Sequence, residues 1–244
     1  FQAEDGIRDR SPSRGLGDVY KRQTQRELLH LGVEASKVIV VRRGLTEYPD
    51  LKPLRLDRRP IRILSVGRLV EKKGFFYQID ILKALKYQEV DFSSRIIGSG
   101  SLDIPLRNYR DTSGLHNDVE FWGELAHDDV RKQFLWADLF LFTGRVSSKG
   151  DRDGLPNVIG EAMAYGVVVL TTDVGATIEA VTDGKSGLVL PSENEEAWVD
   201  AIGQLVDGNS AMEEYRTNSR RWVEEHFNAH KNSRELRKAF RSVV

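Results

Sequence analysis

The sequence contains no cysteine and no long apolar run, and its 36 basic and 37 acidic side chains leave a formal net charge of −1. The absence of cysteine excludes disulfides, thiolate zinc sites and cysteine nucleophiles. No stretch approaches the roughly 18–20 apolar residues that a membrane-spanning helix requires. The near-neutral charge argues against a protein held to nucleic acid by bulk charge. Because the first ten residues also lack the apolar core of a secretory signal, we expect a cytoplasmic protein.

The first 23 residues differ in character from the rest of the chain. They mix charges with Ser, Pro and Gly, show neither a helix nor a strand period, and do not begin with Met. The segment resembles a translated sequencing adapter, although a genuine disordered tail is the alternative. We therefore expect residues 1–23 to be non-native or disordered, and we expect the native protein to extend further toward its N-terminus.

From residue 24 onward, short apolar segments alternate with amphipathic ones. A helix is expected over 24–31 and a strand over 37–41, before a polar stretch punctuated by Pro. The remaining predicted strands are 61–66, 92–97, 119–121, 138–142, 167–171 and 187–190. The remaining predicted helices are 75–86, 102–111, 128–136, 158–165, 176–181, 195–206 and pieces of 211–241.

This alternation predicts an α/β fold, a Rossmann-like domain with a doubly wound parallel sheet. We expect this domain to span residues 61–210, after an interdomain strand and linker over 24–60 and before C-terminal helices over 211–244. In such a sheet, ligands bind at the carboxyl ends of strands, where Gly-rich turns lead into helix N-termini. Three turns of this kind follow predicted strands.

The first turn, residues 67–74 (GRLVEKKG), delivers Arg68, Lys72 and Lys73 to the end of the strand 61–66. Arginine offers a planar fork to phosphate oxygens, and lysine offers a compact, mobile charge. Cations at a helix start oppose the helix dipole, so helix stability does not explain them. The cluster favours diphosphate binding, with a solvated charge cluster as the alternative.

The second turn, residues 98–102 (GSGSL), could be taken for a dinucleotide fingerprint. Asp103 stands where the third glycine belongs, and an anionic side chain there would repel a pyrophosphate. A lone G-x-G is a weak signal, so a tight structural turn explains these residues equally well.

The third turn, residues 150–166 (GDRDGLPNVIGEAMAYG), is a Gly-rich loop that leads into a helix starting near Asn157. Backbone N–H groups before the helix can face a phosphate or sugar oxygen. Asp153 in the loop and Glu161 in the helix carry carboxylates, which accept hydrogen bonds from sugar and ribose hydroxyls. The alternative places Asp153 as a turn cap and Glu161 on a solvent face, which the apolar sequence after Glu161 disfavours.

These three segments, together with VEFWGEL and DGKSGLVLP, occur in the order typical of one known family. From about residue 39 to 206, the chain resembles the C-terminal half of a family-4 glycosyltransferase with the GT-B fold. The resemblance implies that this half binds a nucleotide-sugar donor. It also implies that an N-terminal domain supplies the acceptor site and a catalytic histidine, and that transfer retains the anomeric configuration.

Matched one residue at a time, the resemblance assigns Arg68 and Lys73 to the donor diphosphate and Glu161 to the ribose hydroxyls. Asp153 matches the first acid of the family's paired-carboxylate motif, where Glu is the more common residue. We expect Arg68 and Lys73 to stabilise the negative charge that develops as the nucleoside diphosphate leaves the anomeric carbon. Asp153 completes the predicted catalytic set as an acceptor for sugar hydroxyls, not as a covalent nucleophile.

Further donor-binding positions are predicted from the backbone of the loops. Leu125 matches the region whose backbone meets the base, and Gly154 and Leu155 match the turn that faces the sugar and phosphates. The loop ends complete the predicted set with Gly67, Pro156 and Asn157.

No metal and no cofactor is expected, because two cations can take the part that a divalent ion plays in other transferases. The expected substrate is a UDP- or GDP-linked sugar. The histidines lack zinc-type spacing, and His127 is interpreted as a helix-cap or surface residue. Arg145 and Lys149 are candidates for additional positive charge near the third turn.

Three functions compete on this sequence. The leading hypothesis is the donor-binding half of a hexosyltransferase that acts on a polysaccharide or glycolipid acceptor, associates with a membrane surface and binds no nucleic acid. Such a half needs its N-terminal GT-B domain, so we expect it to be inactive alone. The second hypothesis is a non-catalytic nucleotide- or sugar-binding module of the same fold. The third, a Rossmann-type oxidoreductase, is disfavoured by Asp103 and the incomplete fingerprint.

Overall fold

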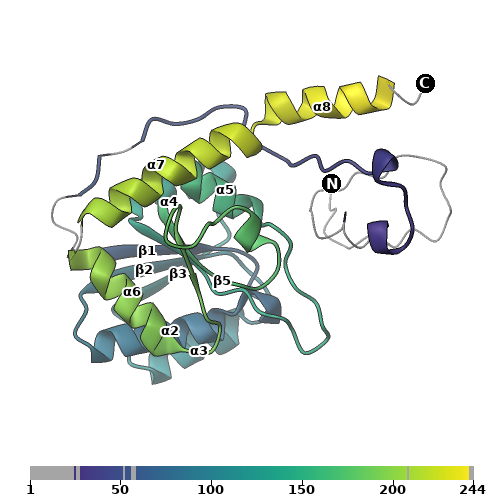
Figure 1. Cartoon of the computed structure of the whole chain (residues 1–244). Helices are drawn as coiled ribbons and strands as arrows, with labels where there is room; N and C mark the ends of the chain where they lie inside the picture. Colours follow the sequence, from purple (N-terminus) through teal and green to yellow (C-terminus); the bar gives the residue numbers. More distant parts are fainter. Residues whose placement is uncertain (1–24, 26–27, 52, 56–58, 208, 242–244) are drawn as a thin grey trace.

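The computed structural model describes residues 25, 28–51, 53–55, 59–207 and 209–241. The segment 1–23 that was predicted to be non-native or disordered lies outside these residues. Within the described part of the chain, six strands form one sheet in the order β3-β2-β1-β4-β5-β6, and every neighbouring pair is parallel (Figure 1). The strands are β1 (Ile61–Val66), β2 (Phe92–Ile97), β3 (Val119–Gly123), β4 (Leu139–Phe142), β5 (Val168–Thr172) and β6 (Leu188–Leu190).

Helices cover both faces of the sheet, which confirms the predicted doubly wound α/β fold. In Figure 1, α2, α3 and α6 lie on one face, and α4, α5 and α7 lie on the other. The helix α8 runs on from the end of α7, away from the sheet (Figure 1). The helices are α2 (Phe75–Tyr87), α3 (Asp103–Thr112), α4 (His127–Trp136), α5 (Asn157–Ala164), α6 (Glu195–Asp207), α7 (Asn209–His226) and α8 (Ala229–Arg241).

Two hydrophobic clusters hold these layers together, one on each face of the sheet. Alternate residues of β1 serve both clusters, since Ile61 and Ile63 pack with α2 and α6 while Leu64 packs with α4 and α5. Every residue of β4 and β5 is buried, as expected for central parallel strands covered on both faces. The core therefore fixes where the strand ends lie.

The helix α7 and the residues that follow it pack onto the sheet domain through specific contacts. Phe227 lies so close to Gly160 that a side chain on this glycine would collide with the ring. The buried guanidinium of Arg216 donates from Nε to the carbonyl of Gly166 at 2.9 Å. Gly44 lies equally close to the backbone between α7 and α8, where Leu45 and Asn228 form a bridge. Thus α7 links the segment around residue 44 to α5.

The strand predicted over residues 37–41 is wrong. Residues 35–37 form a short 3-10 helix, Val40 takes part in an isolated bridge, and residues 38–41 lie outside the six-stranded sheet. The β-branched side chains give the segment a high strand propensity, but strand propensity depends strongly on tertiary context.

The helix predicted over residues 176–181 is reduced to a single 3-10 turn, Thr177–Glu179. The Thr177 hydroxyl donates to the carbonyls of Thr172 at 2.9 Å and Val174 at 3.3 Å. Such side-chain bonds to the preceding backbone compete with regular helix. Gly175, at φ +79, turns the chain here, where a side chain would collide with the carbonyl of Asp153.

Candidate functional site

The strand order reverses between β1 and β4, and the loops that follow these two strands meet above that point. A crevice at the carboxyl ends of such strands is where open α/β sheets bind ligands. The first loop ends at Gly74, which has φ +69. A Cβ added at this glycine would collide with the carbonyl of Thr143. The Thr143 hydroxyl donates to the Gly74 carbonyl at 3.0 Å. These contacts hold the β1 loop directly against the β4 loop.

The contact between the loops brings Lys73 and Asp153 together. The Lys73 ammonium lies 3.0 Å from Oδ2 of Asp153, and both side chains are only 12–15% exposed. The same ammonium lies 5.2 Å from the ring centroid of Phe142, within range of a cation–π contact. Oδ2 of Asp153 is buried, and its ion pair with Lys73 lacks hydrogen-bond geometry. The aliphatic stem of Lys73 lies next to Gly67.

Lys72 and Arg68 join the same cluster. The Lys72 ammonium lies 3.0 Å from Asp151 and 3.6 Å from Asp153. Burial alone would lower the pKa of Lys72, but the two carboxylates outweigh burial and raise this pKa above its ordinary value. The hydrogen bond from Lys72 lowers the pKa of Asp151, and the charge of Arg68 lowers it further. The structure therefore brings Lys72, Lys73, Asp151 and Asp153 together after the ends of β1 and β4, with the charge of Arg68 close enough to act on Asp151.

The turn over residues 145–151 is fastened to the first loop. The Glu71 carboxylate accepts from the Ser148 amide at 2.8 Å and from its hydroxyl at 2.9 Å. These two hydrogen bonds, with the nearby charges of Arg145 and Lys149, lower the pKa of Glu71. The Arg145 amide also donates to the Lys72 carbonyl at 2.9 Å. Arg145 and Lys149 thus lie beside the cation cluster, where the sequence alone could not place them.

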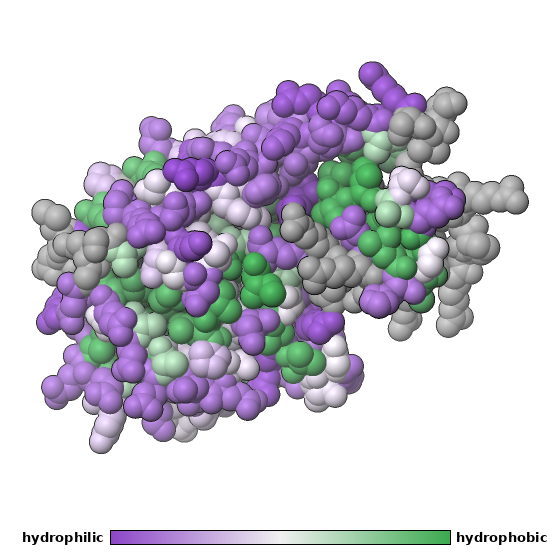
Figure 2. Space-filling view, viewed as in Figure 1, coloured by the Kyte–Doolittle hydropathy of each residue, from purple (hydrophilic) through white to green (hydrophobic). Residues whose placement is uncertain are grey.

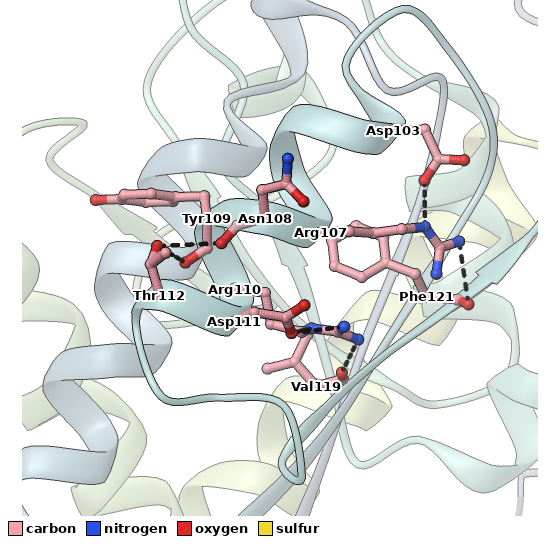
Figure 3. A network of polar contacts seen from close by, with 9 residues as sticks. All are labelled: Asp103, Arg107, Asn108, Tyr109, Arg110, Asp111, Thr112, Val119 and Phe121. Carbon is pink, nitrogen blue, oxygen red and sulfur yellow. Dashed lines mark hydrogen bonds and ion pairs between the residues drawn. The ribbon is translucent and has the colours of Figure 1, made fainter.

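The second glycine turn supports the first loop. A side chain on Gly98 would collide with the carbonyl of Gly67, and one on Gly100 would collide with Leu69. Asp103, in the place of a third fingerprint glycine, binds Arg107 at 2.7 Å on α3 (Figure 3). The turn therefore acts through backbone packing, which agrees with the structural interpretation.

Glu161 faces the N-terminus of α4 across a small cavity. Its carboxylate lies 3.5 Å from Nε2 of His127, and its side chain is 19% exposed. His127 is the first residue of α4 and is 56% exposed, which agrees with its interpretation as a helix-cap or surface residue. Its contact with Glu161 was not predicted from the sequence. The cavity holds about 160 Å³. Its other lining residues include Leu45, Tyr48, Arg131 and Tyr165.

The remaining predicted positions lie in the same loops. Leu125 is half-buried just before α4 and packs on the core of that face. Gly154 lies half-buried beside the turn at Gly175, and Leu155 packs half-buried on the core of the α4–α5 face. No side chain caps the start of α5. The helix start itself consists of Pro156 and Asn157.

A larger groove lies elsewhere, between α2 and α6, with a volume of about 830 Å³. Four carboxylates line it against a single lysine, Lys83, and such a lining repels phosphate. The acids are Asp80, Glu195, Glu196 and Asp200. The size of this groove therefore does not make it the better anion site.

The described residues hold neither a metal-binding cluster nor a membrane-spanning helix. Among the residues with described positions, no group of three or more His, Asp or Glu side chains is placed to hold a metal ion. Within the same ranges, no helix combines the length and apolarity needed to cross a bilayer.

In the space-filling view, α7 and α8 form a hydrophilic band along the top of the molecule (Figure 2).

Some site contacts were missed by sequence reasoning. They are the ion pair of Lys72 with Asp151, the contact of His127 with Glu161, and an ion pair of Arg42 with Glu179 at 2.8 Å. The alternating acids in the run DRD gave a signal for the first contact, since Asp151 precedes Asp153 by two residues. The other two join segments far apart in the chain and left no local pattern.

Comparison with known proteins identifies the family to which this chain belongs. The profile described as "Glycosyl transferases group 1" matches residues 49–222. The chain is 31% identical over 213 residues to the amylovoran biosynthesis glycosyltransferase AmsK of Erwinia amylovora, covering 87% of this chain and 52% of AmsK. It is 33% identical over 214 residues to the putative colanic acid biosynthesis glycosyltransferase WcaL of Escherichia coli (strain K12), covering 86% of this chain and 52% of WcaL.

Solved structures agree on the fold. The UDP complex of Anabaena HepE superposes with a TM-score of 0.77 at 18% identity, covering 92% of this chain and 63% of HepE. The chain spans about half the length of the two curated relatives named above. Since the family profile covers most of the chain, this protein belongs to the glycosyl transferases group 1 family.

Proposed function

We propose that this chain is the donor-binding half of a retaining GT-B glycosyltransferase of family 4. The complete protein transfers a hexose from a nucleoside-diphosphate sugar to a polysaccharide or glycolipid acceptor. An N-terminal domain supplies the acceptor site and the remaining catalytic groups, so this half binds the donor without transferring it. The chain spans about half of AmsK and WcaL, whose names refer to the biosynthesis of amylovoran and colanic acid.

The observation that carries this proposal is the pairing of Lys73 with Asp153 where the strand order reverses, with Arg68 at the same edge. A diphosphate needs cations, and a sugar needs acceptors for its hydroxyls. This crevice offers both within one cluster, on loops that are fixed by backbone contacts. Glu161, on the helix that follows the same loop, supplies the acceptor for the ribose hydroxyls.

The proposed chemistry follows from the leaving group. As the bond between the anomeric carbon and the diphosphate oxygen breaks, negative charge grows on that oxygen. Arg68 and Lys73 stabilise this charge in the crevice, an effect that is often worth about 3–4 kcal/mol for each donor group. The carboxylate of Asp153, 15% exposed beside Lys73, accepts from a sugar hydroxyl and orients the anomeric carbon. The two cations replace a divalent ion, so chelators should leave donor binding unchanged.

The proposed donor carries UDP or GDP. The HepE structure that shares this fold contains UDP. The base lies against the backbone near Leu125, the ribose against Glu161 and the diphosphate against the β1 loop.

We further propose that the complete protein works in the cytoplasm and contacts the inner face of a membrane. The basic helix α8 supports this, because lysine and arginine near an anionic bilayer favour binding. We expect this chain to sediment with anionic vesicles but not with neutral ones. Equal sedimentation with both kinds of vesicle contradicts the proposed membrane contact. Against a single acid, Glu235, α8 carries Lys231, Arg234, Arg237, Lys238 and Arg241.

Isothermal titration of the 244-residue chain with UDP, GDP and ADP tests the donor site. We expect binding of at least one nucleoside diphosphate, with a loss of roughly 10- to 100-fold in Arg68→Ala and Lys73→Ala, because each removes a charge-assisted hydrogen bond to phosphate. Lys132→Ala, which removes an exposed cation on α4, is the matched control. No heat from a folded chain with any of the three ligands contradicts the proposal.

A further inference from the structure

The β4 loop presents carboxylates to the same lysines that the diphosphate requires. Asp151 lies 3.0 Å from Lys72, and Asp153 lies within 3.6 Å of both lysine ammonium groups. Carboxylate and phosphate oxygens accept the same N–H groups of a lysine. Without a donor, therefore, acids of the chain itself occupy these cations.

The two acids differ in how firmly they are held. Asp153 is 15% exposed, whereas Asp151, on the turn over residues 145–151, is 62% exposed. Both backbone groups of Asp151 bond within this turn, since its carbonyl accepts from the Ser147 amide at 2.8 Å and its amide donates to the Ser147 hydroxyl at 3.1 Å. Asp151 can therefore swing its side chain away while the turn keeps its shape.

Lys72 is the complementary case. Its side chain is only 16% exposed, so it cannot turn freely into solvent, and its partners are Asp151 and Asp153. An exposed carboxylate on a lysine contributes only a few-fold to an equilibrium constant. A diphosphate carries more charge than one carboxylate and repels the acid that it approaches. The exchange of Asp151 for a phosphate oxygen is thus favourable for Lys72.

We propose that Lys72 is a third cation for the donor diphosphate, and that Asp151 is a displaceable counter-ion that covers Lys72 until the donor arrives. The inference rests on the proposed function, and it adds that the Asp151 carboxylate and the donor diphosphate compete for Lys72. The Glu71–Ser148 hydrogen bonds keep the turn, and with it Asp151, above Lys72 in the donor-free protein. Donor affinity therefore includes the cost of breaking one ion pair inside the site.

If Asp151 competes with the donor for Lys72, then removing the charge of Asp151 should raise the affinity for a nucleoside diphosphate. We expect Asp151→Asn to tighten the binding of UDP or GDP roughly two- to fivefold, the range set by an exposed ion pair. Lys72→Gln should weaken it about tenfold, and Lys72→Arg should stay within about threefold of the unaltered chain. In the Lys72→Gln background, Asp151→Asn should have less than about a twofold effect.

Titration calorimetry of the 244-residue chain and these variants tests the inference, with inorganic pyrophosphate as a second probe. The matched controls are Asp129→Asn and Lys132→Gln, which break an exposed Lys–Asp pair of 2.8 Å on α4 and should change affinity less than about twofold. A thermal unfolding curve for each variant shows that it is folded.

The outcomes separate this inference from the function on which it rests. Tighter binding in Asp151→Asn that vanishes in the Lys72→Gln background supports it. If the unaltered chain binds UDP or GDP and Asp151→Asn binds equally or more weakly, the inference is overturned and the proposed function stands. An equal gain with and without Lys72 also overturns it, because the gain is then a general charge effect. If the unaltered chain binds none of these anions, the proposed function fails, and the inference fails with it.

Discussion

The two ends of the proposed donor site are built differently. At the phosphate end, three cations and two carboxylates lie on touching loops, and Lys72 and Lys73 are already paired with acids. At the nucleoside end, the Glu161 carboxylate lies 3.5 Å from Nε2 of His127 beside a cavity of about 160 Å³. The first end is dense and charge-paired, and the second is open.

Because of this difference, we expect the phosphate end to contribute to the affinity for any diphosphate and the nucleoside end to select among nucleotides. At the phosphate end, donor binding exchanges existing ion pairs for new ones, so the net gain is smaller than the number of cations suggests. At the nucleoside end, few pairs must be broken, and the shape and hydrogen bonds of the ligand decide the outcome. A ligand without a nucleoside should therefore reveal the phosphate end alone, which makes pyrophosphate a useful probe.

The largest effect should follow from damage to the backbone of the phosphate end. Gly74→Ala forces a side chain onto a residue at φ +69 and against the Thr143 carbonyl. We expect a loss of roughly 1–3 kcal/mol in the free energy of unfolding, together with weaker binding of both UDP and pyrophosphate, since Lys73 adjoins Gly74. Urea denaturation and calorimetry measure the two effects.

The control for this variant is Gly203→Ala, inside α6, where a side chain meets nothing within 4 Å. Here the same change should stabilise the protein by about 0.5–1 kcal/mol, because alanine favours helix. Equal stability changes in the two variants would show that the contact between the β1 and β4 loops is not needed.

The next effect concerns the nucleoside end. Glu161→Gln keeps the shape of the side chain and removes its charge, so UDP should bind about five- to tenfold more weakly because ribose hydroxyls lose a charged acceptor. Pyrophosphate binding should stay within about twofold, since it has no ribose. Glu235→Gln on α8 is the matched control. An equal loss for UDP and pyrophosphate would contradict the division into two ends.

The phosphate end was far more predictable from sequence than the nucleoside end. Arg68 and Asp153 follow strands whose apolar runs are clear, and parallel strands bring their carboxyl ends to one edge, so their proximity follows from topology. The contact of His127 with Glu161 depends on how α4 packs beside α5, and no local pattern encodes that packing. The strand predicted at 37–41 lies outside the sheet, and local hydrogen bonds of the Thr177 hydroxyl accompany the shortened helix at 176–181, so local propensity alone predicted neither segment correctly.

The smallest effect concerns the fastening of the turn over residues 145–151. Ser148 lowers the pKa of Glu71, so this contact contributes fully above the ordinary carboxyl value of 4.5 and is lost as the pH falls through the lowered value. In an NMR titration, the Ser148 amide shift should therefore have a midpoint below 4.5. The Lys231 amide, which donates to the neutral side chain of Asn228, should move much less. A Ser148 midpoint at or above 4.5 would contradict the contact.

The central claim is that the cations of the β1 loop bind the diphosphate of a donor at the β1–β4 crevice. A crystal structure of this chain with UDP tests it most directly. The account predicts phosphate oxygens within hydrogen-bond distance of Arg68 and Lys73, the ribose against Glu161, and Asp151 turned away from Lys72. UDP bound elsewhere, such as in the groove between α2 and α6, with the Lys73–Asp153 pair untouched, would contradict it.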